Sequence, residues 1–234
     1  MYQPIVSLRD RTAIGFEALL RWQHQDRGLI APAVFLGVAE DTGLITRIDG
    51  WVLRRACADA RQWQPECGAS VSVNISAQSF GQPDIVERVS ATVQETGLDP
   101  QYLRLEITES TAMADAERAR LVLADLKALG VRISLDDFGT GYSSLSYLQR
   151  FPVDTLKIDR SFVSEMDRNE GCREIVRTVM NLARTLGLEV IAEGTETAAQ
   201  VHDLERLECR FGQGYFFSEP LPLEQLRELQ TSKA

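Results

Sequence analysis

Histidine is scarce in this chain, and its cysteines form no paired motif. Of the 234 residues two are histidines, His24 and His202, which lie far apart and are flanked by polar residues. A histidine-based zinc site and a Ser-His-Asp triad are therefore poorly supported. Four cysteines occur without any C-x-x-C pair, each in or beside a helix-like stretch: Cys57, Cys67, Cys172 and Cys209. We expect thiols without a chemical role in a reducing compartment.

Long apolar runs and a leader segment are also missing. No stretch of about 18 apolar residues exists, no signal peptide is visible, and Met1 leads directly into the strand-like segment Y-Q-P-I-V. We expect residues 1–234 to form one cytoplasmic domain without direct membrane insertion. A chain that begins inside a strand favours a module excised from a larger protein, and that parent protein could be membrane-tethered.

Basic charge is in deficit, with a net charge of -9 and a pI of about 4.9. The electrostatic footprint of a protein that binds long nucleic acid is therefore absent. An acidic protein can still bind a small phosphate ester if a metal ion neutralises the site. With 44% hydrophobic residues, the chain is long enough for one large core.

Helix-like and strand-like segments alternate almost to the end of the chain. Apolar spacing near 3.6 predicts helices over 45–63, 84–96, 116–129, 172–186 and 197–207. Strands are predicted over 2–8, 14–20, 71–76, 103–109, 131–138, 154–160, 188–193 and 213–217. An antiparallel sheet with one wet face is the alternative, but crossovers that contain a helix make parallel pairs. The pattern favours an α/β fold, a TIM-type (β/α)8 barrel.

One strand of this barrel must run backwards. Strands 2–8 and 14–20 are joined by only about five residues, R-D-R-T-A, too few for a parallel crossover, so this pair is predicted to be an antiparallel hairpin. If strand 14–20 runs with the majority, strand 2–8 is the reversed one. Its beginning, near Gln3, then falls on the same rim as the ends of the other strands.

Polar residues lie at or near the ends of the predicted strands. In segments such as 103–108, apolar and polar residues alternate, so the polar ones share one face of the strand. They are predicted to converge on one rim of the barrel: Glu17, Asn74, Glu106, Asp136, Asp137, Lys157, Glu193 and Gln213. Carboxylate and amide oxygens suit Mg²⁺ or Mn²⁺ rather than zinc. Asp136 and Asp137 can both serve this site only where their strand ends, and together they suggest two metals.

Lys157 has two open interpretations. It could form a buried ion pair with Asp159, which lies on the same strand face, or it could hold the attacking water and offset phosphate charge. The segment F-G-T-G-Y-S-S-L at 138–145 could be a plain turn into a helix. Beside the acids, an active-site loop is the favoured interpretation.

Seven motifs in register resemble one family. They are E-A-L at 17–19 with Arg21, V-N-I-S-A at 73–77, L-E-I-T-E-S at 105–110, D-D-F-G-T-G-Y-S-S-L at 136–145, L-K-I-D-R-S-F-V at 156–163, A-E-G-T-E-T at 192–197 and Q-G-Y-F-F-S-E-P at 213–220. Together they resemble the EAL domain of bacterial cyclic di-GMP phosphodiesterases over essentially the whole chain. E-A-L alone would carry no information.

The resemblance implies hydrolysis of cyclic di-GMP to linear pGpG by in-line attack of a metal-activated water, with Mg²⁺ or Mn²⁺ in two sites. It also implies a homodimer and a multidomain signalling parent protein. The implied roles are metal ligands (Glu17, Asn74, Glu106, Asp136, Asp137, Glu193), catalytic residues (Lys157, Glu193, Asp137, Glu17), substrate contacts (Gln3, Arg21, Asp159, Gln213) and a loop anchor (Glu109, Gly139, Gly141). Whether Glu193 is a metal ligand or a proton acceptor stays open.

Two residues depart from the family pattern. Thr195 stands where valine is usual, and Arg210 replaces an aspartate, which we expect to alter the substrate mouth or a contact near it. Two alternatives compete with the enzyme: an inactive cyclic di-GMP receptor that signals through protein contacts, and another metal-dependent barrel such as an enolase-like enzyme. The chain keeps the acids, Lys157 and the glycine loop, which favours the phosphodiesterase.

Overall fold

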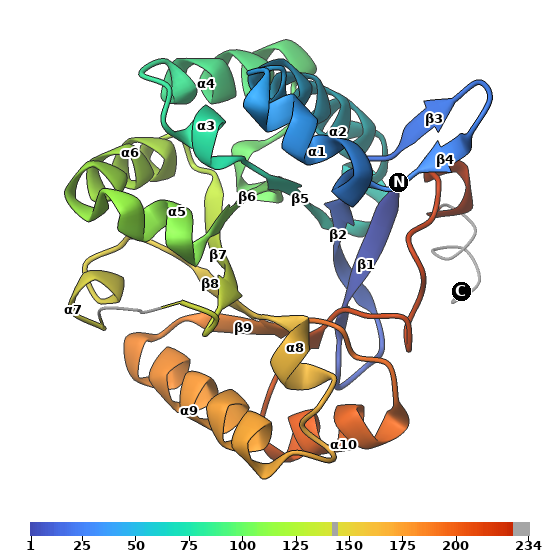
Figure 1. Cartoon of the computed structure of the whole chain (residues 1–234), viewed down its shortest axis with the longest axis vertical. Coiled ribbons are helices and arrows are strands. Elements are labelled where there is room, and N and C mark those ends of the chain that lie inside the picture. The colour runs from blue at the N-terminus through green and yellow to red at the C-terminus, as the bar shows by residue number, and fades with distance from the viewer. Residues whose placement is uncertain (142–144, 227–234) are drawn as a thin grey trace.

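The computed structural model describes residues 1–141 and 145–226, and its centre is a closed eight-stranded barrel (Figure 1). Around the barrel the strands follow the order β1 (Tyr2–Ser7), β10 (Phe211–Gly212), β9 (Glu189–Ala192), β8 (Thr155–Ile158), β7 (Arg132–Phe138), β6 (Leu103–Thr108), β5 (Ser70–Asn74) and β2 (Ala13–Ala18). The predicted TIM-type barrel is confirmed.

Strand β1 is antiparallel to both of its neighbours, β2 and β10, whereas the other neighbouring pairs are parallel. The turn after β1 is closed by a hydrogen bond from Ser7 N to Thr12 O (2.8 Å). In the hairpin register Gln3 lies opposite Glu17. The reversed strand therefore brings Gln3 to the rim that Glu17 occupies, as the short connection predicts.

The predicted long helices surround the barrel (Figure 1). They are α2 (Ile45–Cys67), α4 (Ile85–Thr96), α6 (Ala116–Ala128), α9 (Glu170–Leu186) and α10 (Ala198–Arg206). Shorter helices are α3 (Ala77–Phe80), α5 (Glu109–Ala114), α7 (Leu145–Leu148), α8 (Arg160–Val163) and the 3-10 helix Pro100–Tyr102. Gly97 and Gly187 end their helices with φ of 67° and 71°, a left-handed conformation that costs glycine little.

The short helices were not predicted, and neither were the elements that connect β2 to α2. A hairpin of β3 (Trp22–His24) and β4 (Gly28–Ile30) and helix α1 (Pro32–Asp41) connect β2 to α2. The hairpin strands have three residues each and α1 buries only Ala39, so neither gives a clear apolar period.

The predicted last strand, 213–217, is wrong. The strand is Phe211–Gly212, and the chain then turns, with Phe216 N donating to Thr195 O (3.0 Å). A Cβ on Gly214 would come within 2.1 Å of Thr195 O. This close approach of the chain after β10 to the chain after β9 explains why the strand stops.

The apolar strand residues pack in the layer between barrel and helices, where Val71, Leu103, Ile133 and Leu156 are fully buried. The side chains on the other face of each strand fill the inside of the barrel. Arg104 Nη1 donates to Thr155 Oγ1 (2.7 Å), although β6 and β8 are not neighbours, so this contact crosses the interior. Among the described residues, no helix is both long and apolar enough to cross a bilayer.

Candidate active site

Lys157 is the centre of the site. Its side chain is 0% exposed, and its Nζ lies 2.6 Å from Glu106 Oε2, 2.6 Å from Glu193 Oε1, 3.3 Å from Glu17 Oε2 and 3.6 Å from Asp136 Oδ1. These four carboxylates come from β2, β6, β7 and the residue that follows β9. Residues that are far apart in sequence thus meet because each lies at or near the carboxyl end of a barrel strand.

These four ion pairs bear on the interpretation of Lys157 as the partner of Asp159. Asp159 lies beyond the end of β8 and caps helix α8, where it accepts a hydrogen bond from Ser161 N (3.0 Å). The simple Lys157–Asp159 ion pair is therefore wrong. Burial alone would lower the pKa of Lys157, but the surrounding carboxylates raise it well above its usual value. The ammonium stays charged across the physiological range.

Glu17 is held by three donors. Asn74 Nδ2 donates to its Oε1 (2.7 Å), while Gln213 Nε2 (2.6 Å) and Lys157 Nζ (3.3 Å) donate to Oε2. Burial acts to raise the pKa of Glu17, but Lys157 and the two amides outweigh it, and the pKa is lowered. Gln213 Nε2 also donates to Gln3 Oε1 (3.1 Å). Both predicted glutamines therefore join the acid network.

The pKa values of Glu106 and Glu193 shift in the opposite direction to that of Glu17. Burial, followed by neighbouring acids and only partly offset by Lys157, raises the pKa of Glu106 to about 8 and raises that of Glu193 well above its usual value. Oε1 of Glu106 is buried and accepts no hydrogen bond from any described residue. A buried oxygen without a donor is what a missing cation would leave.

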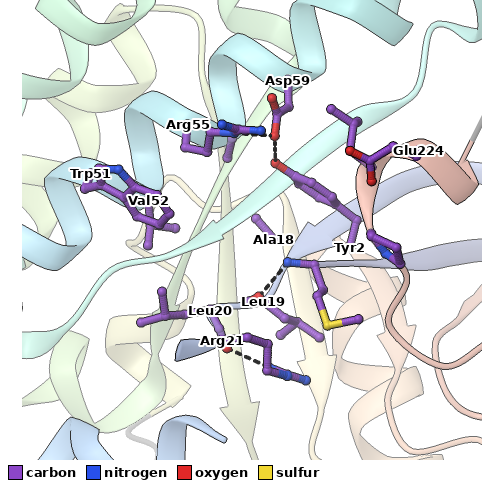
Figure 2. Close-up of a pocket in the computed structure, with 14 residues that line it drawn as sticks. Tyr2, Ala18, Leu19, Leu20, Arg21, Trp51, Val52, Arg55, Asp59 and Glu224 are labelled. Carbon is purple, nitrogen blue, oxygen red and sulfur yellow. Dashed lines mark hydrogen bonds and ion pairs between the residues drawn. The ribbon is translucent and has the colours of Figure 1, made fainter. Parts of the chain in front are cut away.

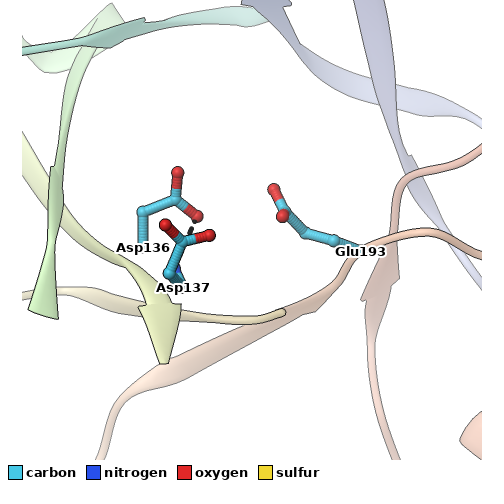
Figure 3. A group of neighbouring side chains, drawn as sticks. All are labelled: Asp136, Asp137 and Glu193. Atoms are coloured by element: carbon cyan, nitrogen blue, oxygen red, sulfur yellow. Dashed lines mark hydrogen bonds between the residues drawn. The ribbon is translucent and has the colours of Figure 1, made fainter. Parts of the chain in front are cut away.

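Asp136 and Asp137 face the same side through a backbone irregularity. Asp137 has φ of 54°, and the β7–β8 register shifts between Leu135 and Phe138. A bulge inserts one residue and re-aims a side chain, so the strand does not have to end here and continues to Phe138. Figure 3 shows the two aspartates opposite Glu193, with ligand oxygens of the three residues within 4.8 Å of one another.

The donor set fits hard divalent cations. Five carboxylates and the Asn74 amide face one buried ammonium, so the site has a large excess of negative charge when all its acids are ionised. Oxygen ligands of this kind suit Mg²⁺ or Mn²⁺. Two observations agree with a metal site of this kind: Oε1 of Glu106 is buried without a hydrogen-bond donor among the described residues, and the acids of Figure 3 lie close together.

The glycine loop is tied to Glu109. This buried carboxylate accepts a hydrogen bond from Gly139 N (3.0 Å), and a Cβ on Gly141 would come within 2.9 Å of its Oε1. Gly139 has φ of 98°, a conformation that L side chains rarely adopt. The remaining loop residues, 142–144, lie outside the described residues.

Two predicted substrate residues lie outside this network of direct contacts. Arg21 Nη1 donates to Leu20 O (2.7 Å), and its side chain lines a pocket of about 310 Å³ together with Trp51 and Arg55 (Figure 2). Asp159 lies near enough to Asp137 to help raise the pKa of that carboxyl, after burial and Asp136. Asp159 therefore borders the acid cluster, whereas the described contacts of Arg21 lie in the pocket of Figure 2.

Asp49 was missed by sequence reasoning. From helix α2 its buried Oδ2 accepts hydrogen bonds from Ser76 N (3.1 Å) and Ser76 Oγ (2.5 Å). This contact fixes the turn that follows Asn74. An acid on a helix gives no signal of this role, because its partner is distant in sequence.

The two residues that depart from the family pattern, Thr195 and Arg210, lie in different parts of the barrel. Thr195 is fully buried, and its N donates to Gln213 O (3.1 Å), so it supports the backbone behind the site. Arg210 stacks on Phe211 and lines a groove with Leu188 and Glu189, where β9 begins. The expectation that Arg210 alters the substrate mouth is therefore wrong, because it lies at the opposite end of the barrel from the acids.

A closed barrel with a carboxylate-rich site at the carboxyl ends of its strands defines a TIM-type barrel protein with an enzyme-like rim. Within that class, the chain belongs to the EAL domain family, whose sequence profile matches residues 1–220. The resemblance read from the seven motifs is confirmed, and the enolase-like alternative is excluded. The family is metal-dependent, and the acid cluster agrees with this.

Curated relatives and solved structures extend this likeness. The bifunctional diguanylate cyclase/cyclic di-GMP phosphodiesterase MucR of Pseudomonas aeruginosa is 47% identical over 227 residues, which cover 96% of this chain and 33% of MucR. The cyclic di-GMP phosphodiesterase NbdA of the same organism is 43% identical over 229 residues, covering 97% and 29%. A solved PaMucR phosphodiesterase in complex with c-di-GMP has a TM-score of 0.94 at 47% identity, covering 96% of this chain and 92% of that one. The chain spans about a third of the length of these curated relatives.

Proposed function

We propose that this chain is a metal-dependent phosphodiesterase that hydrolyses cyclic di-GMP to linear 5′-pGpG. The observation that carries the proposal is Lys157 buried among four carboxylates, beside the Asp136–Asp137 bulge. The named activities of MucR and NbdA and the c-di-GMP complex of PaMucR support the choice of substrate.

Two Mg²⁺ or Mn²⁺ ions are part of this proposal. Glu17, Asn74, Glu106 and Asp136 would hold one ion, and Asp136, Asp137 and Glu193 the second. The charge of the site supports two metal ions. Five ionised carboxylates beside one ammonium leave four negative charges, which two divalent ions would neutralise. When bound, such ions neutralise the phosphate and lower the pKa of a coordinated water.

The remaining chemistry falls to the chain's own residues. A water oxygen attacks phosphorus in line, the bond to the 3′ oxygen breaks, and a proton reaches that oxygen. Lys157 would orient the acids and the attacking water. Glu193 forms an ion pair with Lys157. As an alternative to binding the second metal, it would accept a proton from the attacking water. Gln3, Gln213, Arg21 and Asp159 would contact the nucleotide, with Arg21 suited to a phosphate.

The assembly is also proposed. We propose that residues 1–234 act as one cytoplasmic domain of a longer signalling protein and associate as a homodimer. The greater length of MucR and NbdA supports the first statement.

Conversion of cyclic di-GMP is the direct test. We expect the purified chain with Mg²⁺ or Mn²⁺ to convert cyclic di-GMP to pGpG. Chromatographic separation of the two nucleotides measures the conversion. Addition of a chelator should stop the conversion. Tight binding of cyclic di-GMP without turnover, with both metals tried, would instead establish the receptor alternative.

Metal binding should release protons near neutral pH. Glu106 has a pKa of about 8 without metal, so it is mostly protonated at pH 7, yet a metal ligand must be ionised. Metal affinity should therefore rise as pH rises toward about 8 and level off above it, and Glu193 adds to the effect. Titration calorimetry in buffers of different ionisation enthalpy measures the protons released. Glu106→Gln should reduce that number, and an affinity that is constant from pH 6.5 to 9 would contradict the assignment.

A further inference from the structure

An apolar groove, distinct from the acid cluster, shares Arg21 and Trp51 with the pocket of Figure 2. It has a volume of about 870 Å³ and lies between helix α1, hairpin β3–β4 and the first turns of α2. None of the acid-site residues lines it. Trp22 of the hairpin packs edge-on against Phe35 of α1, with ring centroids 5.6 Å apart. This contact holds two walls of the groove together, so the groove is already formed in the isolated chain.

The walls expose an unusual number of large apolar side chains. Val34 is 67% exposed, Val38 63%, Trp51 59% and Trp22 47%. Val34 and Val38 are four residues apart, so with Phe35 they form one stripe along α1. Exposed apolar patches of this kind mark interaction surfaces.

The charge of the groove is opposite to that of the chain. Its lining contains Arg21, Arg27, Arg47 and His24, and within the described residues it contains no Asp or Glu. Arg27 and Arg47 are exposed, and among the described residues neither forms an ion pair. The net charge of the whole chain is -9. A cationic apolar groove on an acidic protein selects a ligand that is both apolar and negatively charged.

We propose that this groove binds an amphipathic helix of a partner protein that carries acidic residues beside its apolar face. Helix α1 has 10 residues, so its stripe is about 15 Å long. A partner helix of about three turns can lie along it at about 8–10 Å, with acids facing Arg27 and Arg47.

Two other occupants fit less well. The site is concave and the chain acidic, so an anionic membrane surface would be repelled by most of the protein. A second copy related by a two-fold axis through the groove would place the same arginines opposite each other. An acidic helix meets neither obstacle.

Selection from a displayed library of random 16-residue peptides tests the proposal with the full chain. The recovered peptides should have apolar residues at i, i+3 and i+4 and an excess of Asp and Glu. Their affinity is then measured by fluorescence anisotropy at low and high salt. Combined Val34→Glu and Val38→Glu substitutions should weaken binding at least about tenfold, since they place charge on the apolar stripe. Combined Arg27→Glu and Arg47→Glu should do the same and reduce the salt dependence.

Leu121→Glu is the matched control, because Leu121 is 55% exposed on helix α6, and it should leave peptide binding unchanged. Recovery only of basic peptides, or of peptides that bind the groove variants equally well, overturns the proposal. So does groove-dependent sedimentation with phosphatidylserine vesicles, or a dimer that the Val34 and Val38 changes dissociate. No readout uses turnover, so the result is independent of the proposed activity.

Discussion

Glu17→Ala should abolish hydrolysis of cyclic di-GMP while leaving the barrel folded. Glu17 accepts hydrogen bonds from Asn74, Gln213 and Lys157, and its lowered pKa keeps it ionised and ready to hold a cation. Its loss removes a proposed metal ligand and the acceptor that orients a second one, Asn74. We expect kcat/KM to fall by at least about 10³-fold, which corresponds to about 4 kcal/mol of lost transition-state stabilisation.

The fold should survive this substitution for an electrostatic reason. Two amide donors lose their acceptor, which costs about 1–3 kcal/mol, but Lys157 keeps three carboxylate partners and the crowding of acids is relieved. Circular dichroism and thermal unfolding check this. Glu205→Ala is the control, since Glu205 forms an exposed ion pair with Arg11 far from the acids, and its activity should be unchanged. Turnover by Glu17→Ala within tenfold of the original chain would remove Glu17 from the metal site.

The barrel and most of the rim could be predicted because each depends on local rules. The short connection between the first two strands forces β1 to run backwards, and parity directs Glu106 inward from β6. Both inferences need only the residue period and the length of a loop. For the same reason the prediction located Asn74 and Gln213 at the rim without knowing their partners.

The features that sequence could not predict depend on contacts between distant segments or on irregular backbone. The bulge at Asp137 breaks the two-residue period, so parity alone predicts that the paired acids diverge. Asp49 acts on Ser76 across a helix–strand interface. The four partners of Lys157 come from strands that only barrel closure brings together, which is why a local pair with Asp159 was an equally reasonable prediction.

Lys157→Met should separate the stabilising role of this residue from its role in chemistry. The methionine fills a similar volume in a site that is fully buried, but it leaves four carboxylates without the buried ammonium that contacts them all. Breaking a buried ion pair in this way costs about 3–5 kcal/mol. Glu106 and Glu193 can relieve the repulsion by binding protons, so their already raised pKa values in the folded variant rise further above those of the unfolded chain. Stability of the metal-free variant is therefore highest at low pH and falls as pH rises through neutrality.

Divalent metal should restore the fold of this variant but not its activity. Mg²⁺ or Mn²⁺ would replace the missing positive charge, so the metal-induced rise in Tm should be larger than in the original chain. Turnover at saturating metal should stay at least about 10³-fold lower if Lys157 also orients the attacking water. Lys127→Met is the matched control, because Lys127 forms a half-exposed ion pair with Asp154 away from the site, and it should lower stability by about 1 kcal/mol or less at unchanged activity. Full activity of metal-saturated Lys157→Met would reduce Lys157 to a charge that stabilises the empty site, and the chemistry would then rest on the carboxylates alone.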